Sequence, residues 1–184
     1  KERKLTNERV HMLEKLKKLS ITDGLTKLYN SRHFYNQLLG EIDRSNRYNH
    51  PLSLLILDID HFKDYNDSFG HLEGDKVLIR IGLIIKPLLR KMDSAYRYGG
   101  EEFTVILPET DGNEAQTVAQ RIRKAVKAEK FSPKGSSTPE TITISLGVTK
   151  YNPGEDISEF IQRADKALYG SKEDGRDMVS AIFL

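Results

Sequence analysis

Acidic residues stand at two points of the chain where a strand is predicted to end or to begin. Asp58 lies near the end of the apolar run 52–59, and Glu101 follows directly after Gly99-Gly100. A two-residue glycine loop favours a hairpin, because both glycines can adopt positive φ, and glycine also lets a bound molecule approach the backbone closely. If this hairpin pairs beside the strand 52–59, the two carboxylates meet at one edge of a sheet.

Two carboxylates that meet in this way could bind a metal ion. Hard oxygen donors suit Mg²⁺, and such an ion can neutralise a triphosphate and stabilise charge during nucleotidyl transfer. Each feature also has an ordinary interpretation, as a solvated aspartate at a strand end and as a surface turn. Other motifs for phosphate or metal fail: a Gly-Lys-Ser/Thr loop is absent, and an EF-hand read from Asp58 places Lys63 and Phe69 where Gly and Glu are required.

The hydrophobic pattern predicts an α/β (α+β) fold in which helices cover a mixed sheet. The predicted strands are 52–59, 94–98, 101–107, 141–149 and 177–183, and the predicted helices are 31–48, 72–90, 112–129 and 156–173. The run 52–59 is almost wholly apolar, as expected for a central strand that is buried on both faces. Residues 60–71 are polar, and we expect them to be irregular.

Composition excludes several classes of protein. The chain has 184 residues, a formal net charge of +2 and no cysteine, so disulfides and thiolate metal sites are excluded. The near-neutral charge gives no electrostatic reason to expect nucleic-acid binding. Apolar runs are too short to span a membrane and a signal peptide is not visible. We therefore predict a cytoplasmic segment without membrane contact, and the start at Lys1 suggests a piece of a longer protein.

Residues 1–19 have the pattern of a charged helix. Leu5, Met12 and Leu19 are seven residues apart, and Leu16 lies between the last two. This short heptad pattern is compatible with a solvated linker or with a coiled coil, and we favour a dimerising connector to an upstream sensor domain. The domain itself is predicted to span 20–184.

Four ordered segments together resemble the GGDEF-domain diguanylate cyclase family. The segment 97–103 (RYGGEEF) is similar to the defining signature of the family. The other matching segments are 23–32 (DGLTKLYNSR), 57–75 (LDIDHFKDYNDSFGHLEGD) and 164–177 (ADKALYGSKEDGRD). The resemblance covers residues 20–184, and four motifs in the expected order make it specific.

The resemblance implies a fold and an activity. The fold would be a central mixed, largely antiparallel five-stranded sheet surrounded by helices, similar to the adenylyl cyclase core and the polymerase palm. The activity would be condensation of two GTP into cyclic di-GMP and two pyrophosphate, in a dimer that completes the site. The alternatives are a catalytically silent GGDEF domain that binds cyclic di-GMP, and an enzyme that makes a mixed guanine–adenine product.

The resemblance also assigns the catalytic and metal-binding residues. Asp58, the backbone carbonyl of Ile59, and Glu101 would coordinate Mg²⁺ or Mn²⁺, with Glu102 as a supporting acid. Glu101 is the proposed general base for the ribose 3′-hydroxyl, and Lys63 would contact the phosphates. The family does not use the position of Asp60 as a principal ligand.

Further positions match substrate-binding residues of the family. Asn66 and Asp75 would read guanine, since a carboxylate accepts hydrogen bonds from N–H groups that adenine lacks, and we predict that Asp75→Ser relaxes selectivity for GTP over ATP. His71 would lie close to the nucleotide, or pack in a loop. Lys172 would contact phosphate, as would Arg176 if the helix persists that far. The list of substrate-binding positions is completed by Gly99 and Gly100, which would make room for the nucleotide.

Arg90 and Asp93 match an inhibitory product site placed just before the signature. Arg can pair with guanine O6 and N7, and Asp can accept from guanine N–H groups, so feedback inhibition by product is predicted. Three positions depart from the family pattern: Lys27 stands where Gly is usual, Ser31 where Arg is usual, and Asp177 where Asn is usual. None of them removes a metal-binding or guanine-reading group.

Overall fold

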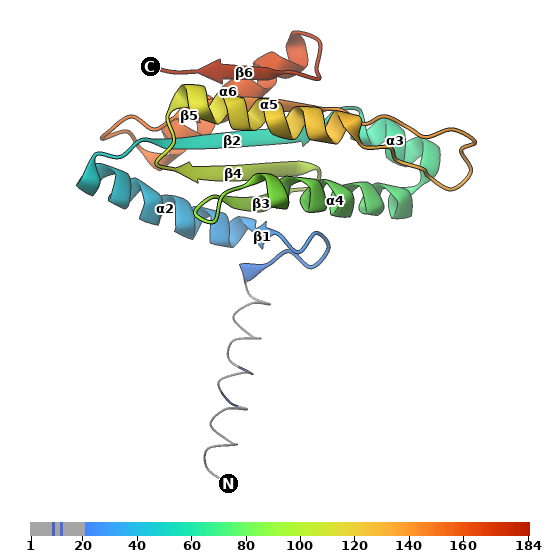
Figure 1. Cartoon of the computed structure of the whole chain (residues 1–184), viewed down its shortest axis with the longest axis horizontal. Helices are drawn as coiled ribbons and strands as arrows, with labels where there is room; N and C mark the ends of the chain where they lie inside the picture. Colours follow the sequence, from blue (N-terminus) through green and yellow to red (C-terminus); the bar gives the residue numbers. More distant parts are fainter. Residues whose placement is uncertain (1–8, 10–11, 13–20) are drawn as a thin grey trace.

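A computed structural model describes residues 9, 12 and 21–184. The helix predicted over residues 1–19 therefore lies outside the described residues, except for two positions. In the described part, helices cover both faces of one sheet (Figure 1). The strands are β1 (Tyr29–Asn30), β2 (Leu52–Ile59), β3 (Ser94–Gly99), β4 (Glu102–Pro108), β5 (Ile144–Lys150) and β6 (Val179–Ile182), and the helices are α2 (Ser31–Tyr48), α3 (Phe62–Phe69), α4 (His71–Ile85), α5 (Gly112–Ala128) and α6 (Ile157–Glu173).

The sheet has the strand order β1-β3-β4-β2-β5-β6. Strand β2 lies between β4 and β5 and pairs antiparallel with both. The outer pairs, β1 with β3 and β5 with β6, are parallel. The predicted mixed, largely antiparallel sheet is thus confirmed, but the predicted count of five strands is wrong. The sixth strand is β1, whose two residues are too few to produce a strand pattern.

Alternation along β2 divides the core into two layers. Leu55, Leu57 and Ile59 belong to one cluster, which includes the apolar faces of α4 and α5. Leu54 and Ile56 belong to a second cluster, which includes the apolar faces of α2 and α6. Every residue of β2 is buried, as predicted from its apolar sequence, so the strand that carries Asp58 is held from both sides.

The segment predicted to be irregular, 60–71, contains the helix α3. Phe62, Tyr65 and Phe69 are spaced three and four residues apart, which places them on one side of a helix. Phe62 is buried, and the rings of Tyr65 and Phe69 lie 4.9 Å apart. The polar residues between these aromatic residues obscure the helical pattern, so the prediction of an irregular segment was wrong. The predicted helix 72–90 is also shorter, because α4 ends at Ile85 and a 3-10 turn, η1 (Lys86–Leu88), follows.

The glycine hairpin forms, but its turn is shifted by one residue. Gly99 pairs with Glu102, so Gly100 and Glu101 form the turn, and the register shifts between Arg97 and Gly99. Neither Gly99 nor Gly100 has positive φ, so the conformational reason given for these glycines is wrong. Arg97 fixes the turn instead, by donating from Nε and Nη2 to the carbonyl oxygen of Gly100 at 3.1 and 2.9 Å.

Candidate active site

Three carboxylates gather where β2 ends and the hairpin turns. Asp58 lies directly opposite Glu102 in the antiparallel register, and Glu101 precedes Glu102 in the turn. Asp58 is only 7% exposed, whereas Glu101 and Glu102 are partly buried. The structure therefore brings together the acidic residues that the sequence predicted at one sheet edge.

The surroundings of the three carboxyl groups at this acidic edge disfavour their simultaneous ionisation. Burial raises the pKa of Asp58, and the nearby Lys172 offsets only part of that effect. Burial, followed by repulsion from Asp58, also raises the pKa of both Glu101 and Glu102. Desolvation and like charge act in the same direction on these carboxyl groups. A positive charge placed among them would relieve both effects.

Lys172 already supplies one such charge. It lies in the last turn of α6, and its Nζ is 3.0 Å from Oδ2 of Asp58. The sequence placed Lys172 at the phosphates and did not foresee this ion pair. Because the side chain of Lys172 is about one-third exposed, it is accessible to a bound anion as well as to Asp58. Lys172 therefore links the acidic edge to α6.

The donor set at this edge fits a divalent cation in its chemistry. Asp58, Glu101 and Glu102 offer hard carboxylate oxygens, and Ile59 ends the same strand. Within residues 21–184 and the two described residues before them, no group of three acidic, histidine or cysteine side chains is already arranged as a metal site. An ion bound here would thus take only part of its coordination from side chains and the rest from water or a phosphate.

Asp60 has a structural role, in agreement with its exclusion from the predicted ligands. It is 7% exposed, and its two carboxylate oxygens accept hydrogen bonds from Thr143 Oγ1 at 2.7 Å, Ser145 Oγ at 2.6 Å and the backbone N–H of Asp177 at 3.0 Å. These bonds connect the end of β2 to β5 and to the loop after α6.

The predicted guanine-reading residues lie on the consecutive helices α3 and α4. Asn66 is on α3, and its Oδ1 atom is buried with no hydrogen-bond partner among the described residues. Asp75 is partly buried on α4. An unpaired buried amide oxygen is costly, and a ligand donor would satisfy it. The unpaired oxygen makes Asn66 a candidate ligand-binding residue.

Gly74 is a site residue that the sequence analysis missed. A Cβ atom at this position would lie 1.8 Å from Oδ1 of Asn66, so any side chain at residue 74 would displace the amide. His71 and Lys63 are both exposed, on α4 and α3, and the structure shows no contact that decides the role of either. The signal that could have revealed Gly74 was a glycine inside a helix, which is unfavourable without a packing reason.

Arg176 does not continue the helical face of Lys172, because α6 ends at Glu173. It lies in the following loop with a φ of 64°. Its charge still bears on Asp58: burial raises the pKa of Asp58, whereas Lys172 and, to a smaller extent, Arg176 lower it. The predicted position near the site is thus compatible with the structure, although the helical reasoning was wrong.

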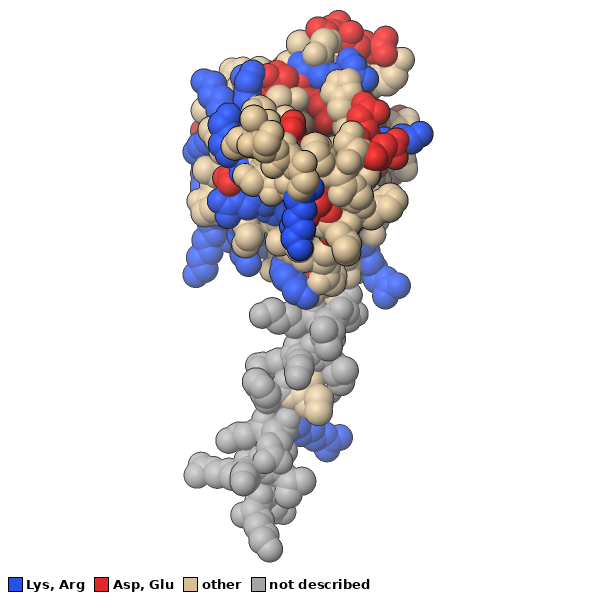
Figure 2. All heavy atoms as spheres, turned by 90° about the vertical axis from the view of Figure 1, so that its right-hand side faces the viewer, with Lys and Arg blue, Asp and Glu red and all other residues tan. Residues whose placement is uncertain are grey.

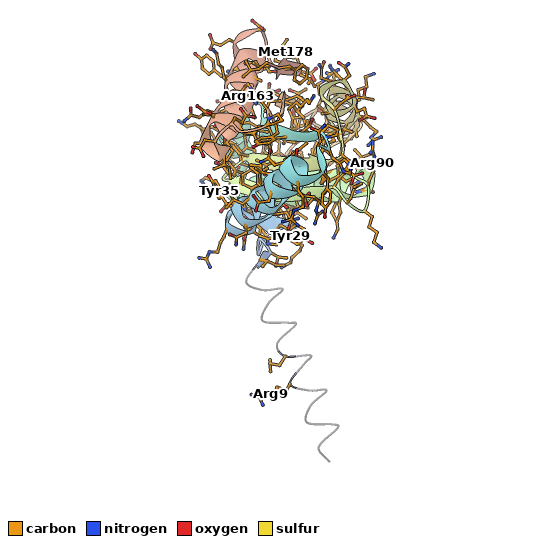
Figure 3. All side chains as sticks on the ribbon, turned by 90° about the vertical axis from the view of Figure 1, so that its left-hand side faces the viewer. Arg9, Tyr29, Tyr35, Arg90, Arg163 and Met178 are labelled. Carbon is orange, nitrogen blue, oxygen red and sulfur yellow. The ribbon has the colours of Figure 1, made fainter. Side chains whose placement is uncertain are left out.

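Arg90 and Asp93 border a separate cavity of about 450 Å³ between η1, β1 and β3. Asp93 Oδ2 accepts from the backbone N–H of Arg90 at 2.8 Å, whereas its Oδ1 is buried and has no partner among the described residues. Burial raises the pKa of Asp93, against the opposing charges of Arg90 and Arg121. Figure 3 places Arg90 and Arg163, which is on α6, at opposite sides of the domain.

Arg121 is a second residue that the sequence analysis missed. It lies on α5, and its Nη2 donates to the carbonyl oxygen of Leu88 in η1 at 2.6 Å. This contact brings a third charged side chain toward the Arg90–Asp93 pair. The separation of 31 residues between Arg90 and Arg121 hides the relation, because only the packing of α5 beside η1 creates it.

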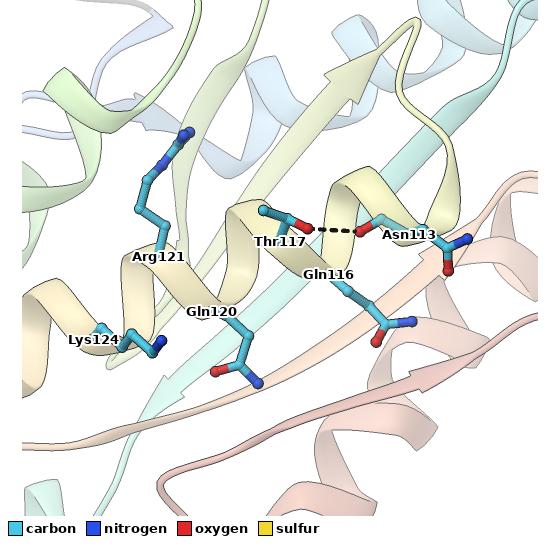
Figure 4. A pocket seen from close by; sticks show the side chains of 6 residues that line it. All are labelled: Asn113, Gln116, Thr117, Gln120, Arg121 and Lys124. Atoms are coloured by element: carbon cyan, nitrogen blue, oxygen red, sulfur yellow. Dashed lines mark hydrogen bonds between the residues drawn. The ribbon is translucent and has the colours of Figure 1, made fainter.

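Other surface features do not add to the site. A larger hollow, of about 600 Å³, is lined by residues of α5 alone, among them Asn113, Gln116 and Lys124 (Figure 4). A groove along the side of one helix lacks the converging groups of a ligand site. The face at the α3 end of the domain carries both basic and acidic side chains (Figure 2). Among the described residues, no helix is long and apolar enough to cross a membrane.

Known proteins match both the sequence and the fold. The family model for "Diguanylate cyclase, GGDEF domain" matches residues 20–178. Diguanylate cyclase A of Treponema denticola is 41% identical over 169 residues, which are 90% of this chain and 45% of that protein. The response regulator PleD of Caulobacter vibrioides is 39% identical over 176 residues, 95% of this chain and 38% of that protein. The chain thus spans less than half the length of these relatives.

Solved structures agree with this match. The coiled coil and GGDEF domain of DgcB from Caulobacter crescentus, in complex with c-di-GMP, aligns with a TM-score of 0.91 at 33% identity, over 98% of this chain and 96% of that one. The separate GGDEF domain of the same protein gives a TM-score of 0.84 at 36% identity, over 88% and 93%. Fold and acidic edge agree with a GGDEF domain. The chain belongs to the GGDEF-domain diguanylate cyclase family.

Proposed function

We propose that two copies of this chain condense two molecules of GTP into one cyclic di-GMP and two pyrophosphates. The observation that carries the proposal is the acidic edge, where Asp58 faces Glu102 in register and holds Lys172 at 3.0 Å. This edge combines buried carboxylates for a cation with a lysine for an anion, as a nucleoside triphosphate requires. The family relationship supports the same activity.

The residues of this chain would bind each GTP at both of its ends. The unpaired Oδ1 of Asn66 would accept from a guanine N–H group, and Asp75 would accept from the N1–H and N2–H₂ edge. Lys63, Lys172 and Arg176 would neutralise the triphosphate. A site that loses such pairing leaves buried polar groups unsatisfied, so it discriminates strongly against adenine.

In the proposed reaction, the 3′-oxygen of one GTP attacks the α-phosphorus of the other. The new O3′–P bond forms as the bond from the α-phosphorus to the bridging oxygen breaks, and pyrophosphate leaves. The proton of the 3′-hydroxyl passes to the carboxylate of Glu101. The carboxylate of Glu101 is partly exposed in the hairpin turn, so it is accessible to a bound nucleotide.

Asp58, Glu101, Glu102 and the carbonyl of Ile59 would hold Mg²⁺ or Mn²⁺. When bound, the ion supplies positive charge that stabilises the triphosphate during transfer. Asp58 is the most deeply buried of these carboxylates, so the protein holds it in place before any ion arrives. An increase in the melting temperature on addition of Mg²⁺, in the absence of nucleotide, would measure this binding directly.

The twofold symmetry of the product requires two domains that face each other, so each copy contributes half of the site. We propose that residues 1–19 connect the domain to an upstream sensor and set the geometry of this dimer. The aligned DgcB structure includes a coiled coil beside its GGDEF domain, which supports the connector. The reaction consumes GTP and is proposed to take place in the cytoplasm.

The cavity beside Arg90 and Asp93 is the proposed site of feedback inhibition by cyclic di-GMP. Its volume of about 450 Å³ suits part of a nucleotide, and the free Oδ1 of Asp93 would accept from guanine. Arg121, on α5, does not line this cavity, but its positive charge acts on Asp93. A catalytically silent cyclic di-GMP receptor would use this same cavity, so the cavity alone does not distinguish an enzyme from a receptor.

One experiment separates the three candidate functions. The chain is incubated with GTP, ATP and Mg²⁺, and the products are identified by mass spectrometry, with Glu101→Gln as the inactive control. Cyclic di-GMP as the single cyclic product supports the proposal. Binding of added cyclic di-GMP without any turnover would assign the silent receptor, and a mixed guanine–adenine product would contradict the proposed selectivity of Asp75.

A further inference from the structure

The loop that follows α6 has an unusual backbone. Gly175, Arg176 and Asp177 have φ values of 120°, 64° and 47°, so three consecutive residues lie in the left-handed region. This region is uncommon for residues other than glycine, although Asp tolerates it better than most. Such a conformation persists only where surrounding contacts determine it. The contacts of this loop must therefore stabilise its left-handed backbone conformation.

Backbone hydrogen bonds hold the loop from inside the domain. The N–H of Arg176 donates to the carbonyl oxygen of Ser171 at 2.9 Å, and the N–H of Asp177 donates to Oδ2 of Asp60 at 3.0 Å. Asp60 is itself bound to Thr143 and Ser145. The buried carboxylate two residues after Asp58 thus ties this loop to the end of the central strand.

Side-chain bonds hold the same loop from outside. Arg123, on α5, donates from Nη1 to Oδ1 of Asp177 at 2.6 Å and to its carbonyl oxygen at 2.9 Å. Lys127, one turn later, pairs with the other carboxylate oxygen. Although burial acts in the opposite direction, these two cations lower the pKa of Asp177, so it stays ionised. The carboxylate binds two cations, which the neutral amide of Asn could not match.

The loop carries Arg176 between these two anchors. Arg176 is exposed, and the next residue, Asp177, donates its backbone N–H to Asp60, two residues after Asp58, so the loop places Arg176 at the end of β2 that carries the acidic edge. Figure 3 marks the end of this loop by Met178, which follows Asp177. A free arginine side chain would lose much conformational entropy when it binds a phosphate. A backbone fixed at Arg176 reduces that loss.

We propose that Asp177, clamped between Arg123, Lys127 and Asp60, is a positioning residue that directs Arg176 toward the triphosphate of the bound nucleotide. This inference rests on the proposed function, because it takes GTP as the ligand. Asp177 itself touches no part of the nucleotide in this account. Its effect is specific to the phosphates and leaves the recognition of guanine unchanged.

The test compares a ligand that has the triphosphate with one that lacks it. Binding of a non-hydrolysable GTP analogue and of guanosine is measured by calorimetry for the wild-type chain, Asp177→Ala, Asp177→Asn and Arg123→Ala. Lys124→Ala is the matched control, because it removes a neighbouring exposed cation of α5. We expect about tenfold weaker binding of the analogue by Asp177→Ala, comparable to one charge-assisted hydrogen bond, with guanosine binding unchanged. Lys124→Ala should behave as the wild type.

A double-mutant cycle with Arg176→Ala decides whether Asp177 acts through Arg176. If it does, Asp177→Ala has no further effect on analogue binding once Arg176 is removed. Equal weakening for the analogue and for guanosine, or additive effects in the cycle, would overturn the inference. If Asp177→Ala does not fold, the same comparison is made with Asp177→Asn, which tolerates the left-handed backbone but loses the charge. A wild-type chain that does not bind the analogue contradicts the proposed function itself.

Discussion

At the scale of single residues, the acidic edge exchanges stability for function. Burial and like charge raise the pKa of Glu101, so the folded state holds a proton on this group more tightly than the unfolded state does. A group of this kind favours folding fully only below its unfolded pKa, and this contribution is lost as the pH rises through the folded pKa. At neutral pH the ionised Glu101 therefore destabilises the fold.

This sign gives a prediction for Glu101→Gln, whose amide imitates the protonated acid. The variant should lose about 100-fold or more of the cyclase activity, the usual effect of removing a general base. Its melting temperature at pH 7 should nevertheless be higher than that of the wild type, and the difference should disappear below about pH 4. Melting curves across this pH range test the claim. A melting temperature lowered at pH 7 would contradict the electrostatic account.

Asp60→Asn is the matched control for this pH series. Asp60 ends the same strand region and is similarly buried, but its oxygens accept three hydrogen bonds. An amide can accept on one side only, so this substitution should lower the melting temperature at pH 7. A higher melting temperature for Glu101→Gln and a lower one for Asp60→Asn, both at pH 7, would distinguish a carboxylate that serves binding from a carboxylate that serves structure.

Asn66 and Gly74 give a second prediction at the residue scale. A methyl group at residue 74 would lie 1.8 Å from Oδ1 of Asn66, so Gly74→Ala should push the amide away from the guanine. We expect the KM for GTP to rise roughly tenfold, the effect of one lost buried hydrogen bond, with a smaller change in kcat. Gly40→Ala, in the open interior of α2, should leave KM unchanged. Steady-state kinetics of both variants measure the contrast.

At the scale of elements, α6 depends on a close approach to β5. A Cβ atom at Gly147 would lie 2.2 Å from the carbonyl oxygen of Ala164 and 2.3 Å from the amide nitrogen of Leu168. Since α6 carries Lys172, Gly147→Ala should displace the phosphate-binding end of the helix. We expect a loss of about 1–3 kcal/mol in unfolding free energy, as for an overpacked core, together with a higher KM for GTP.

Gly170→Ala is the corresponding control within α6. This glycine has no heavy atom within 4 Å of a Cβ position, and alanine favours a helix over glycine by roughly 0.5–1 kcal/mol. The control should therefore be more stable than the wild type. Chemical denaturation of both variants measures the two effects. Similar destabilisation by both substitutions would show that α6 tolerates no change and that close approach to β5 is not the cause.

The elements with one strong local signal were predictable from sequence. The helix Ser31–Tyr48 and the strand Leu52–Ile59 have the predicted bounds, because a helical apolar face and a continuous apolar run are properties of a single segment. The hairpin was predicted from its two glycines, yet its turn is set by the bonds of Arg97 to Gly100. The short strand β1 exists only through its pairing with β3, so no local pattern could indicate it.

The residues of the candidate site likewise divide into those with a local sequence signal and those without one. Asp58 and Glu101 were found from the end of an apolar strand and a glycine hairpin, and Lys172 from a family motif; the structure brings the three together. Gly74 and Arg121 were missed, because their importance depends on the side chain of Asn66 and on the packing of α5 beside η1. Contacts between residues that are distant in the sequence are created by the fold, so they cannot be predicted from the pattern of a single sequence.

At the scale of the whole molecule, the cavity beside Arg90 and Asp93 and the acidic edge are separate places. The cavity lies between η1, β1 and β3, and the acidic edge lies at the end of β2. Arg90→Ala and Arg121→Ala should each weaken inhibition by added cyclic di-GMP about tenfold or more, since each removes a positive charge that acts on Asp93. The initial rate without product should be unchanged. Lys124→Ala, next to Arg121 on α5, should retain full inhibition in the same dose–response assay.

The symmetry of the product makes a prediction about mixtures of chains. If each turnover requires a competent half-site from both copies, an inactive partner removes an active copy from use. One part of the wild-type chain is mixed with nine parts of Glu101→Gln, at a fixed total concentration that allows the copies to exchange partners. The rate per wild-type chain should fall about tenfold, because roughly nine of ten partners are then inactive. An equal amount of an unrelated protein in place of the variant should not lower that rate beyond the effect of dilution. A rate per wild-type chain that is independent of the Glu101→Gln fraction would mean that one copy suffices, and the proposed shared site would be wrong.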